Sequence, residues 1–285
     1  MLFRSHRDPR VLWAVIGGAL VLMVVNWGTE AIKWRLLVRT VEPIPFGRAF
    51  LATIAGTSIG MITPNRVGEF VGRILFLAPE NRIPASFATA VGSISQFVVT
   101  VVMGTIGCIG VFGRAGALGM GPLGIAMIAL CTVVAIGTLV LYFNPDLLHA
   151  LVARLPVVRK WERHAAVLDR FGSPLLARVL LLSVLRYAVF TVQFLVLLMV
   201  FADLPITEAL FAIPVAFLVS TLIPTVMLTE LGVRGSVAVA LISPQLAQDR
   251  GVFLASTALW LVNIAVPALA GSIILLMARI RSSKA

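Results

Sequence analysis

The chain has 285 residues, of which 60% are hydrophobic and 12% are charged, and its formal net charge is +11 at pH 7. Soluble domains carry about 25% charged residues, so this composition excludes an ordinary soluble domain and predicts an integral membrane protein. The basic residues gather at the ends of apolar runs and do not alternate with aromatic residues. This distribution argues against nucleic acid as a partner and favours contact with lipid headgroups.

Five apolar runs reach the length of about 20 residues that a helix needs to cross a bilayer. Two further apolar stretches, 46–79 and 206–247, are interrupted by prolines, glycines and charged residues, and we expect broken or re-entrant segments there. Together they predict an all-α, polytopic helical membrane protein with about 6–8 spans. The five uninterrupted runs are residues 11–29, 84–113, 119–143, 174–201 and 251–278.

The whole chain, residues 1–285, is predicted to form one integral membrane domain, because its polar stretches are too short to bury a core of their own. A long span, a broken stretch and another long span follow one another twice. This order predicts an internal repeat with halves of approximately 11–113 and 174–279, linked by 119–143 and by the polar segment 144–173. The polar segment is either a plain connecting loop or an amphipathic helix on the membrane surface.

Basic residues near both termini and in segment 144–173 predict the orientation of the chain. Because Lys and Arg near span ends mark the cytoplasmic side, we expect the N-terminus, segment 144–173 and the C-terminus in the cytoplasm of a multi-pass protein of the cell (plasma) membrane. An inverted-repeat topology would instead place segment 144–173 outside.

A polar cluster follows Pro64 in the first interrupted stretch. A helix that begins near Pro64 places Arg66, Glu69 and Arg73 three and four residues apart on one face. An ionisable side chain at membrane depth costs about 2.5–3.5 kcal/mol on insertion scales. The cluster is either a binding site for an anionic headgroup, including Asn65, or a salt bridge that holds a re-entrant hairpin. The second arginine favours the binding site, because a salt bridge does not need it.

A similar cluster lies in the second interrupted stretch, where Glu230 and Arg234 are four residues apart after Pro224. The same two interpretations apply, a pair that contacts a ligand or a structural pair. Paired charges in each half of the chain, beside helix-breaking residues, predict a polar site between related halves.

Other polar residues lie singly within the spans. Arg186 is far inside its span and either faces a cavity or snorkels, whereas Glu30 and Lys33 lie near a span end and are interpreted as an interfacial ion pair. Four amides are expected to be hydrogen-bond partners between helices. These amides are Asn26, Gln96, Gln193 and Asn263.

No motif for metal, nucleotide or nucleophilic chemistry occurs in the sequence. The three histidines, His6, His149 and His164, lie outside the predicted spans. We therefore expect no catalytic residue, no metal and no cofactor.

Two stretches resemble the membrane domain of lysylphosphatidylglycerol synthetases, which also occurs alone in a broad family of flippase-like proteins. The stretch from Pro64 to Arg73 resembles the family's Pro-x-Arg-x-Gly-Glu motif and the arginine that follows it, and Lys33 to Leu37 resembles the end of its first span. Gly232-Val233-Arg234 is similar to a later Gly-Val-Arg signature. The resemblance covers approximately residues 11–279.

The resemblance implies a translocase for a membrane lipid: an anionic or aminoacylated phospholipid, or a polyprenyl-phosphate lipid. The family's soluble aminoacyl-transferase domain does not occur in this sequence, so synthesis of aminoacyl lipid is not expected, and a lipid-synthesising enzyme or a second copy of the chain would be its protein partner. Residues 92–97 also lack the acidic-basic cluster that is frequent in the family. Two other functions stay open: a membrane-embedded lipid-modifying enzyme with Glu69 or Glu230 as general base, and a lipid-binding scaffold without transport.

Overall fold

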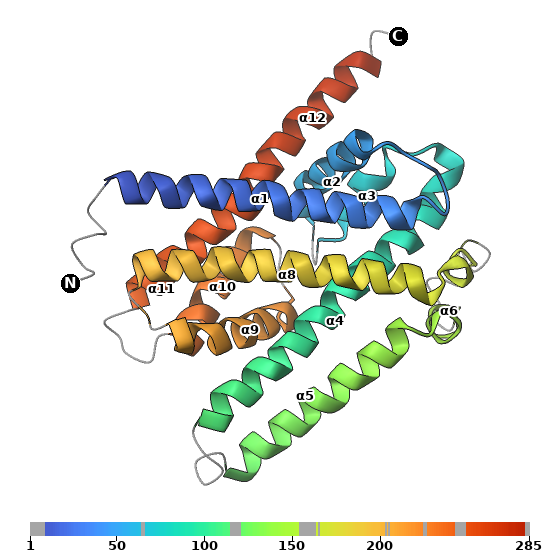
Figure 1. The fold of residues 1–285 in the computed structure, drawn as a ribbon. Helices are drawn as coiled ribbons and strands as arrows, with labels where there is room; N and C mark the ends of the chain where they lie inside the picture. Colours follow the sequence, from blue (N-terminus) through green and yellow to red (C-terminus); the bar gives the residue numbers. More distant parts are fainter. Residues whose placement is uncertain are drawn as a thin grey trace. The chain divides into compact units, whose positions relative to one another are not determined.

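The computed structural model contains helices and no strand over the residues that it describes (Figure 1). The all-α fold class is therefore confirmed. The described residues are 9–63, 66–114, 121–153, 164, 166–202, 204, 206–224, 227–242 and 249–282.

Among the residues that the structure describes, five helical runs are long and apolar enough to cross a membrane. Each overlaps one of the five predicted spans, although the first extends to Val38. On α5, Leu130 and Val133 are 65% and 67% exposed, as expected for side chains that face lipid. The runs are α1 (Pro9–Val38), α4 (Arg82–Arg114), α5 (Gly121–Tyr142), α8 (Ser173–Phe201), and α11 (Asp249–Trp260) continued by the π-helical turn η6 (Leu261–Ala265) into α12 (Val266–Ser282).

Both interrupted stretches fold as pairs of shorter helices. Each of these helices has at most 17 residues, fewer than the about 20 that a full span needs. The predicted breaks are thus present, and re-entry into the membrane stays a prediction. The first pair is α2 (Phe46–Met61) and α3 (Gly68–Ile74), and the second is α9 (Ile206–Leu222) and α10 (Met227–Ile242).

The polar segment 144–173 is partly helical. It contains α6 (Pro145–Ala153) and the 3-10 turn η4 (Leu168–Arg170), and the His149 Nδ1 lies 2.9 Å from the Asp169 Oδ1. The segment is therefore more than a plain loop, while residues 154–163 lie outside the described part of the chain. A further 3-10 turn, η2 (Pro79–Asn81), precedes α4.

The chain forms two compact units that each combine residues from both ends of the sequence. Several long helices contribute one part to each unit, and the internal repeat stays a prediction. Unit 1 comprises Met1–Asn26, Val99–Ile136 and Tyr187–Ala265, and unit 2 comprises Trp27–Val98, Gly137–Arg186 and Val266–Ala285.

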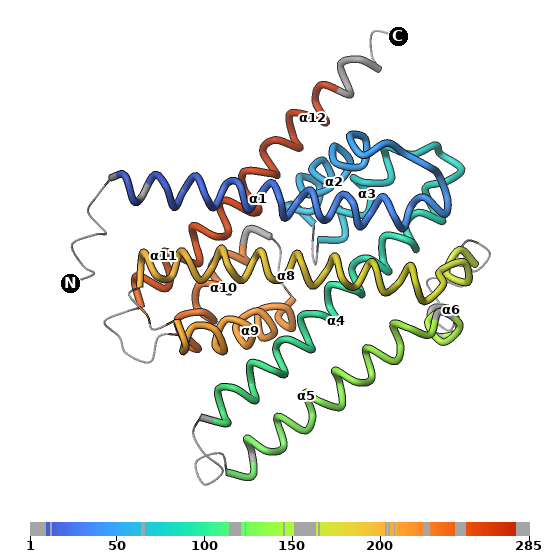
Figure 2. The backbone as a smooth tube through the Cα atoms, in the orientation of Figure 1, coloured from blue at the N-terminus to red at the C-terminus, as the bar shows by residue number. Residues whose placement is uncertain are grey.

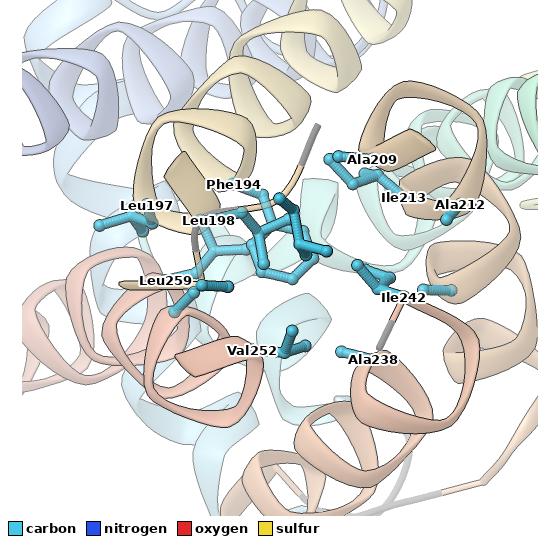
Figure 3. Packing of buried hydrophobic residues seen from close by; sticks show 14 residues of the cluster. Phe194, Leu197, Leu198, Ala209, Ala212, Ile213, Ala238, Ile242, Val252 and Leu259 are labelled. Carbon is cyan, nitrogen blue, oxygen red and sulfur yellow. The ribbon is translucent and has the colours of Figure 1, made fainter. Parts of the chain in front are cut away.

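Unit 1 has an apolar core between α8, α9, α10 and α11 (Figure 3). Leu198, Ile213 and Val252 are fully buried in it. Small residues such as Ala209 and Ala238 fill the space where the helices approach one another. Dispersion contacts between closely packed helices hold such a core together in lipid, where the hydrophobic effect between helices is absent.

Three of the four amides that are expected to be hydrogen-bond partners between helices have this role in unit 1. The Asn26 Nδ2 donates to the Asn263 Oδ1 at 3.1 Å, and the Gln193 Nε2 donates to the Ala19 carbonyl at 2.8 Å. Asn26, Asn263 and Gln193 are buried. These amides therefore connect helices within the unit, as their position inside spans predicts.

In unit 2, α2 and α3 lie side by side (Figure 2). Glycines of both helices form their contact. Each helix contributes two glycines that are four residues apart: Gly56 and Gly60 on α2, and Gly68 and Gly72 on α3. A Cβ at Gly72 would lie 2.5 Å from the Gly56 Cα, and a Cβ at Gly56 would lie 2.8 Å from the Glu69 carbonyl oxygen. The two helices approach this closely because side chains are absent at the contact, and the contact holds the charged side chains of α3 in place.

Candidate functional site

The second half of α1 carries charged residues on a buried face. Trp27, Glu30 and Trp34 follow one another at intervals of three and four residues, and all are buried. Glu30 is 3% exposed and Lys33 is 1% exposed. The predicted ion pair between them is confirmed, since the Lys33 Nζ lies 2.7 Å from the Glu30 Oε2. Helix α1 does not end near residue 29 but continues to Val38, and both side chains are buried in unit 2. Their place at the membrane interface stays a prediction.

Glu30 is the centre of an ion-pair network. Its Oε1 accepts a hydrogen bond from the Arg73 Nη1 at 2.8 Å, and its Oε2 accepts one from the Arg186 Nη1 at 2.8 Å. The Lys33 Nζ lies 2.7 Å from the same Oε2. One buried carboxylate is thus shared by three cations, and charge-assisted hydrogen bonds of this kind are about twice as strong as neutral ones.

The helix expected near Pro64 begins at Gly68 instead, so this prediction is wrong. Arg66 precedes the helix and has a φ of 59°, in the left-handed region that few residues other than glycine adopt. The Thr63 hydroxyl accepts a hydrogen bond from the Gly68 N–H at 2.8 Å, and the Arg66 carbonyl accepts one from the Glu69 N–H at 2.9 Å. These bonds satisfy N–H groups at the start of α3, which lets the chain turn before the helix begins.

Glu69 contacts both arginines of its motif, as the spacing predicts. The Arg66 Nε lies 2.8 Å from the Glu69 Oε1, and the Arg73 Nη2 lies 3.4 Å from the Glu69 Oε2. Arg73 therefore connects Glu69 on α3 with Glu30 on α1. The Arg73 side chain is 6% exposed and that of Arg66 is 31% exposed, so Arg66 is the accessible end of the network.

Arg186 joins the network from the middle of a long helix. It lies 13 residues after Ser173 and 15 residues before Phe201, the ends of α8. At about 1.5 Å per residue, this is about 20 Å from either end. Its guanidinium lies 5.4 Å from the centre of the Trp27 ring and donates to Glu30. The snorkelling interpretation of Arg186 is therefore wrong.

The donors of the network are of a chemical kind that binds oxyanions. The Arg73 Nε is buried, and among the described residues it has no hydrogen-bond partner. Guanidinium groups are planar and present several donors in a fixed geometry that matches the oxygens of a phosphate. Three arginines thus lie beside two carboxylates in this network.

The second predicted cluster lies in unit 1. The Arg234 Nη2 is 2.5 Å from the Glu230 Oε1, and the Arg234 guanidinium lies 5.8 Å from the centre of the Phe190 ring. Glu230 stands in the first turn of α10, where a carboxylate is stabilised by the helix dipole. Within its own unit, the described contacts of this cluster include an ion pair beside the Phe190 ring.

The structure thus groups four predicted site residues, Arg66, Glu69, Arg73 and Arg186, and adds Glu30 and Lys33 to them. Asn65 lies outside the described residues. A rule that treats every acidic residue inside a span as a candidate for function would have found Glu30.

Five apolar spans and a buried network of charged side chains define a multi-pass membrane protein with a polar centre. The chain belongs to the family described as lysylphosphatidylglycerol synthase TM region, whose model matches residues 4–277. Membership implies a function related to membrane lipids and a phospholipid context. Searches of the curated proteins and of the solved structures found no match.

Proposed function

We propose that the chain is a lipid translocase that moves a phosphate-bearing lipid between the leaflets of the cell membrane. The observation that carries this proposal is the network around Glu30, which holds three arginines beside the middle of α8. Arg66, Arg73 and Arg186 would meet the phosphate, and Glu69 would position the arginines. The proposed headgroup-binding residues also include Asn65, which precedes Arg66 in the sequence, and the pair Glu230 and Arg234 of unit 1.

The alternative, a purely structural network, explains fewer of the contacts. Charged groups inside a membrane are expensive even when they are paired. A single pair between α1 and α3 would join these helices, yet Arg66 and Arg186 are present as well. Arg66 also adopts a strained backbone conformation, and strain of this kind gathers at ligand-binding sites.

In this proposal the short helices of each unit are re-entrant. If α2 with α3, and α9 with α10, enter the membrane and return, their connections place non-helical backbone at membrane depth. Such backbone is tolerated where it is buried in protein or lines a wet cavity. Broken helices around a polar site are a common feature of transporters.

A sealed bilayer separates this function from the two alternatives. In vesicles with the purified chain, a labelled phosphate lipid in the inner leaflet should become accessible to an external quencher, whereas vesicles without protein should keep it protected. Chemical conversion of the lipid by the chain in detergent would instead identify a lipid-modifying enzyme. Binding without movement in sealed vesicles would identify a scaffold.

The proposed orientation predicts the result of cysteine labelling. After replacement of Cys108 and Cys131, a single cysteine at Asn144 or Lys284 should resist a membrane-impermeant thiol reagent applied to intact cells, because the basic residues nearby hold these segments in the cytoplasm. A cysteine at Gly113, near the end of α4, should react, because this orientation places it across the membrane from Asn144. Reaction at Asn144 from outside would contradict the orientation and favour the inverted-repeat topology.

A further inference from the structure

The three described partners of Glu30 differ in how accessible they are. In these ion pairs of unit 2, the Arg186 side chain is 20% exposed, whereas those of Arg73 and Lys33 are 6% and 2% exposed. Arg73 also contacts Glu69, so its guanidinium is held by two carboxylates. Arg186 is therefore the partner of Glu30 that an incoming group reaches most easily.

Glu30 keeps a partner on each of its oxygens when Arg186 turns away from it. The Arg73 Nη1 lies 2.8 Å from the Glu30 Oε1, and the Lys33 Nζ lies 2.7 Å from the Oε2. Arg186 donates to this same Oε2. A buried carboxylate is strongly destabilised where its partners are missing. Release of Arg186 leaves both oxygens of Glu30 with a described partner, so the carboxylate stays compensated.

The Trp27 ring holds the Arg186 guanidinium independently of Glu30. The guanidinium lies 5.4 Å from the centre of the ring, and Trp27 is 2% exposed. A ring face attracts a cation through its quadrupole and does not need a hydrogen bond from it. Arg186 is therefore able to exchange one hydrogen-bond acceptor for another while its guanidinium stays over the ring.

A carboxylate and a phosphate present the same chemistry to a guanidinium, paired oxygens with negative charge. We infer that the Glu30 carboxylate occupies Arg186 in the resting chain and that the phosphate of the lipid headgroup displaces it from this arginine. The inference rests on the proposed translocase function and describes how the same site is regulated. Glu30 limits how tightly the headgroup binds, and Arg186 returns to it when the lipid leaves. A transported group must bind well enough to enter and weakly enough to leave.

Competition for Arg186 predicts that a weaker contact from Glu30 strengthens lipid binding, whereas a purely structural Glu30 predicts no gain. In Glu30→Asp the carboxylate is one methylene group shorter, which withdraws it from Arg186 on α8. Phosphatidylglycerol is titrated into the purified chain in detergent, and binding is followed by native mass spectrometry. Glu30→Asp should bind it at least about threefold more tightly than the unmodified chain, and Arg186→Met about tenfold or more weakly.

Three controls show whether the gain comes through Arg186. The double variant Glu30→Asp/Arg186→Met should bind phosphatidylglycerol no more tightly than Arg186→Met, because the gain needs the arginine. Glu42→Asp shortens a carboxylate that lies 3.7 Å from the exposed Arg48, and it should leave the affinity unchanged. Diacylglycerol with the same acyl chains lacks the phosphate and should bind equally to all of these chains.

The unmodified chain provides a second measurement that does not depend on the folding of Glu30→Asp. With 5-fluorotryptophan at its five tryptophans, the fluorine resonance of Trp27 is the one that is absent from Trp27→Phe. Saturating phosphatidylglycerol should shift this resonance, because Arg186 moves over the ring, and it should not shift it in Arg186→Met. The resonance of Trp34, whose Nε1 donates to the Thr89 hydroxyl at 2.9 Å, should stay unchanged in both chains.

Unchanged or weaker binding of phosphatidylglycerol by folded Glu30→Asp would overturn the inference, as would a Trp27 resonance that shifts equally in Arg186→Met. If Glu30→Asp does not fold, the Trp27 resonance decides. Inorganic phosphate that displaces the lipid at an equal concentration would also overturn the inference, because the site would then serve a soluble anion. Tighter binding by Glu30→Asp without lipid movement across sealed vesicles would contradict the proposed translocase function alone.

Discussion

Replacement of Glu30 with glutamine is expected to lower the free energy of unfolding by about 3–5 kcal/mol, the typical cost of removing one partner of a buried ion pair. The substitution leaves Lys33, Arg73 and Arg186 without the carboxylate that they share. Because these cations lie on α1, α3 and α8, their mutual repulsion would separate three elements of unit 2. Thermal unfolding in detergent measures the effect.

Glu42→Gln is the control for this prediction. The Glu42 Oε2 accepts hydrogen bonds from the Ala78 N–H and the Asn81 Nδ2, both at 3.0 Å. An amide oxygen can accept both bonds, so this variant should lose only about 1 kcal/mol. Equal losses for Glu30→Gln and Glu42→Gln would show that Glu30 is not the centre of the network.

Replacement of Arg66 with alanine is expected to slow lipid movement in reconstituted vesicles by about tenfold or more, because one charge-assisted contact to phosphate contributes about 1.5–3 kcal/mol. The fold should persist. Arg66 lies at the accessible end of the network, and Glu69 keeps Arg73 as its partner. Arg48→Ala removes the same charge from an exposed position of unit 2 and should move lipid at the rate of the unmodified chain.

The variant Glu69→Gln separates binding from packing. It removes the partner of Arg66 and one partner of Arg73, and the Glu69 backbone lies against Gly56 of α2. Loss of stability with retained lipid binding is expected. If Arg66→Ala unfolds as readily as Glu69→Gln, or if it moves lipid normally, the network is a structural one.

The sequence predicts the elements of this fold well because each depends on local composition. Apolar runs of about 20 residues locate all five long helices. The spacing of four residues between Glu69 and Arg73, and between Glu230 and Arg234, predicts the two ion pairs that the structure contains. The first feature follows from the rise of the helix and the thickness of the bilayer, and the second follows from the helical period.

The centre of the network could not be predicted from local patterns. Glu30 is separated from Arg73 by 43 residues and from Arg186 by 156 residues, and only the tertiary packing of unit 2 brings them together. The start of α3 was also missed, because the Thr63 hydroxyl and the positive φ of Arg66 are features of a turn and not of helix propensity. Both misses concern residues of the proposed site.

Native mass spectrometry of the purified chain tests the central claim most directly, that the charged network binds the phosphate of a lipid. The unmodified chain should retain a co-purified phosphate lipid, and Arg66→Ala should lose it while remaining folded. Arg48→Ala should retain it. Equal lipid occupancy in the unmodified chain and in folded Arg66→Ala would contradict the claim, since the headgroup would then bind elsewhere.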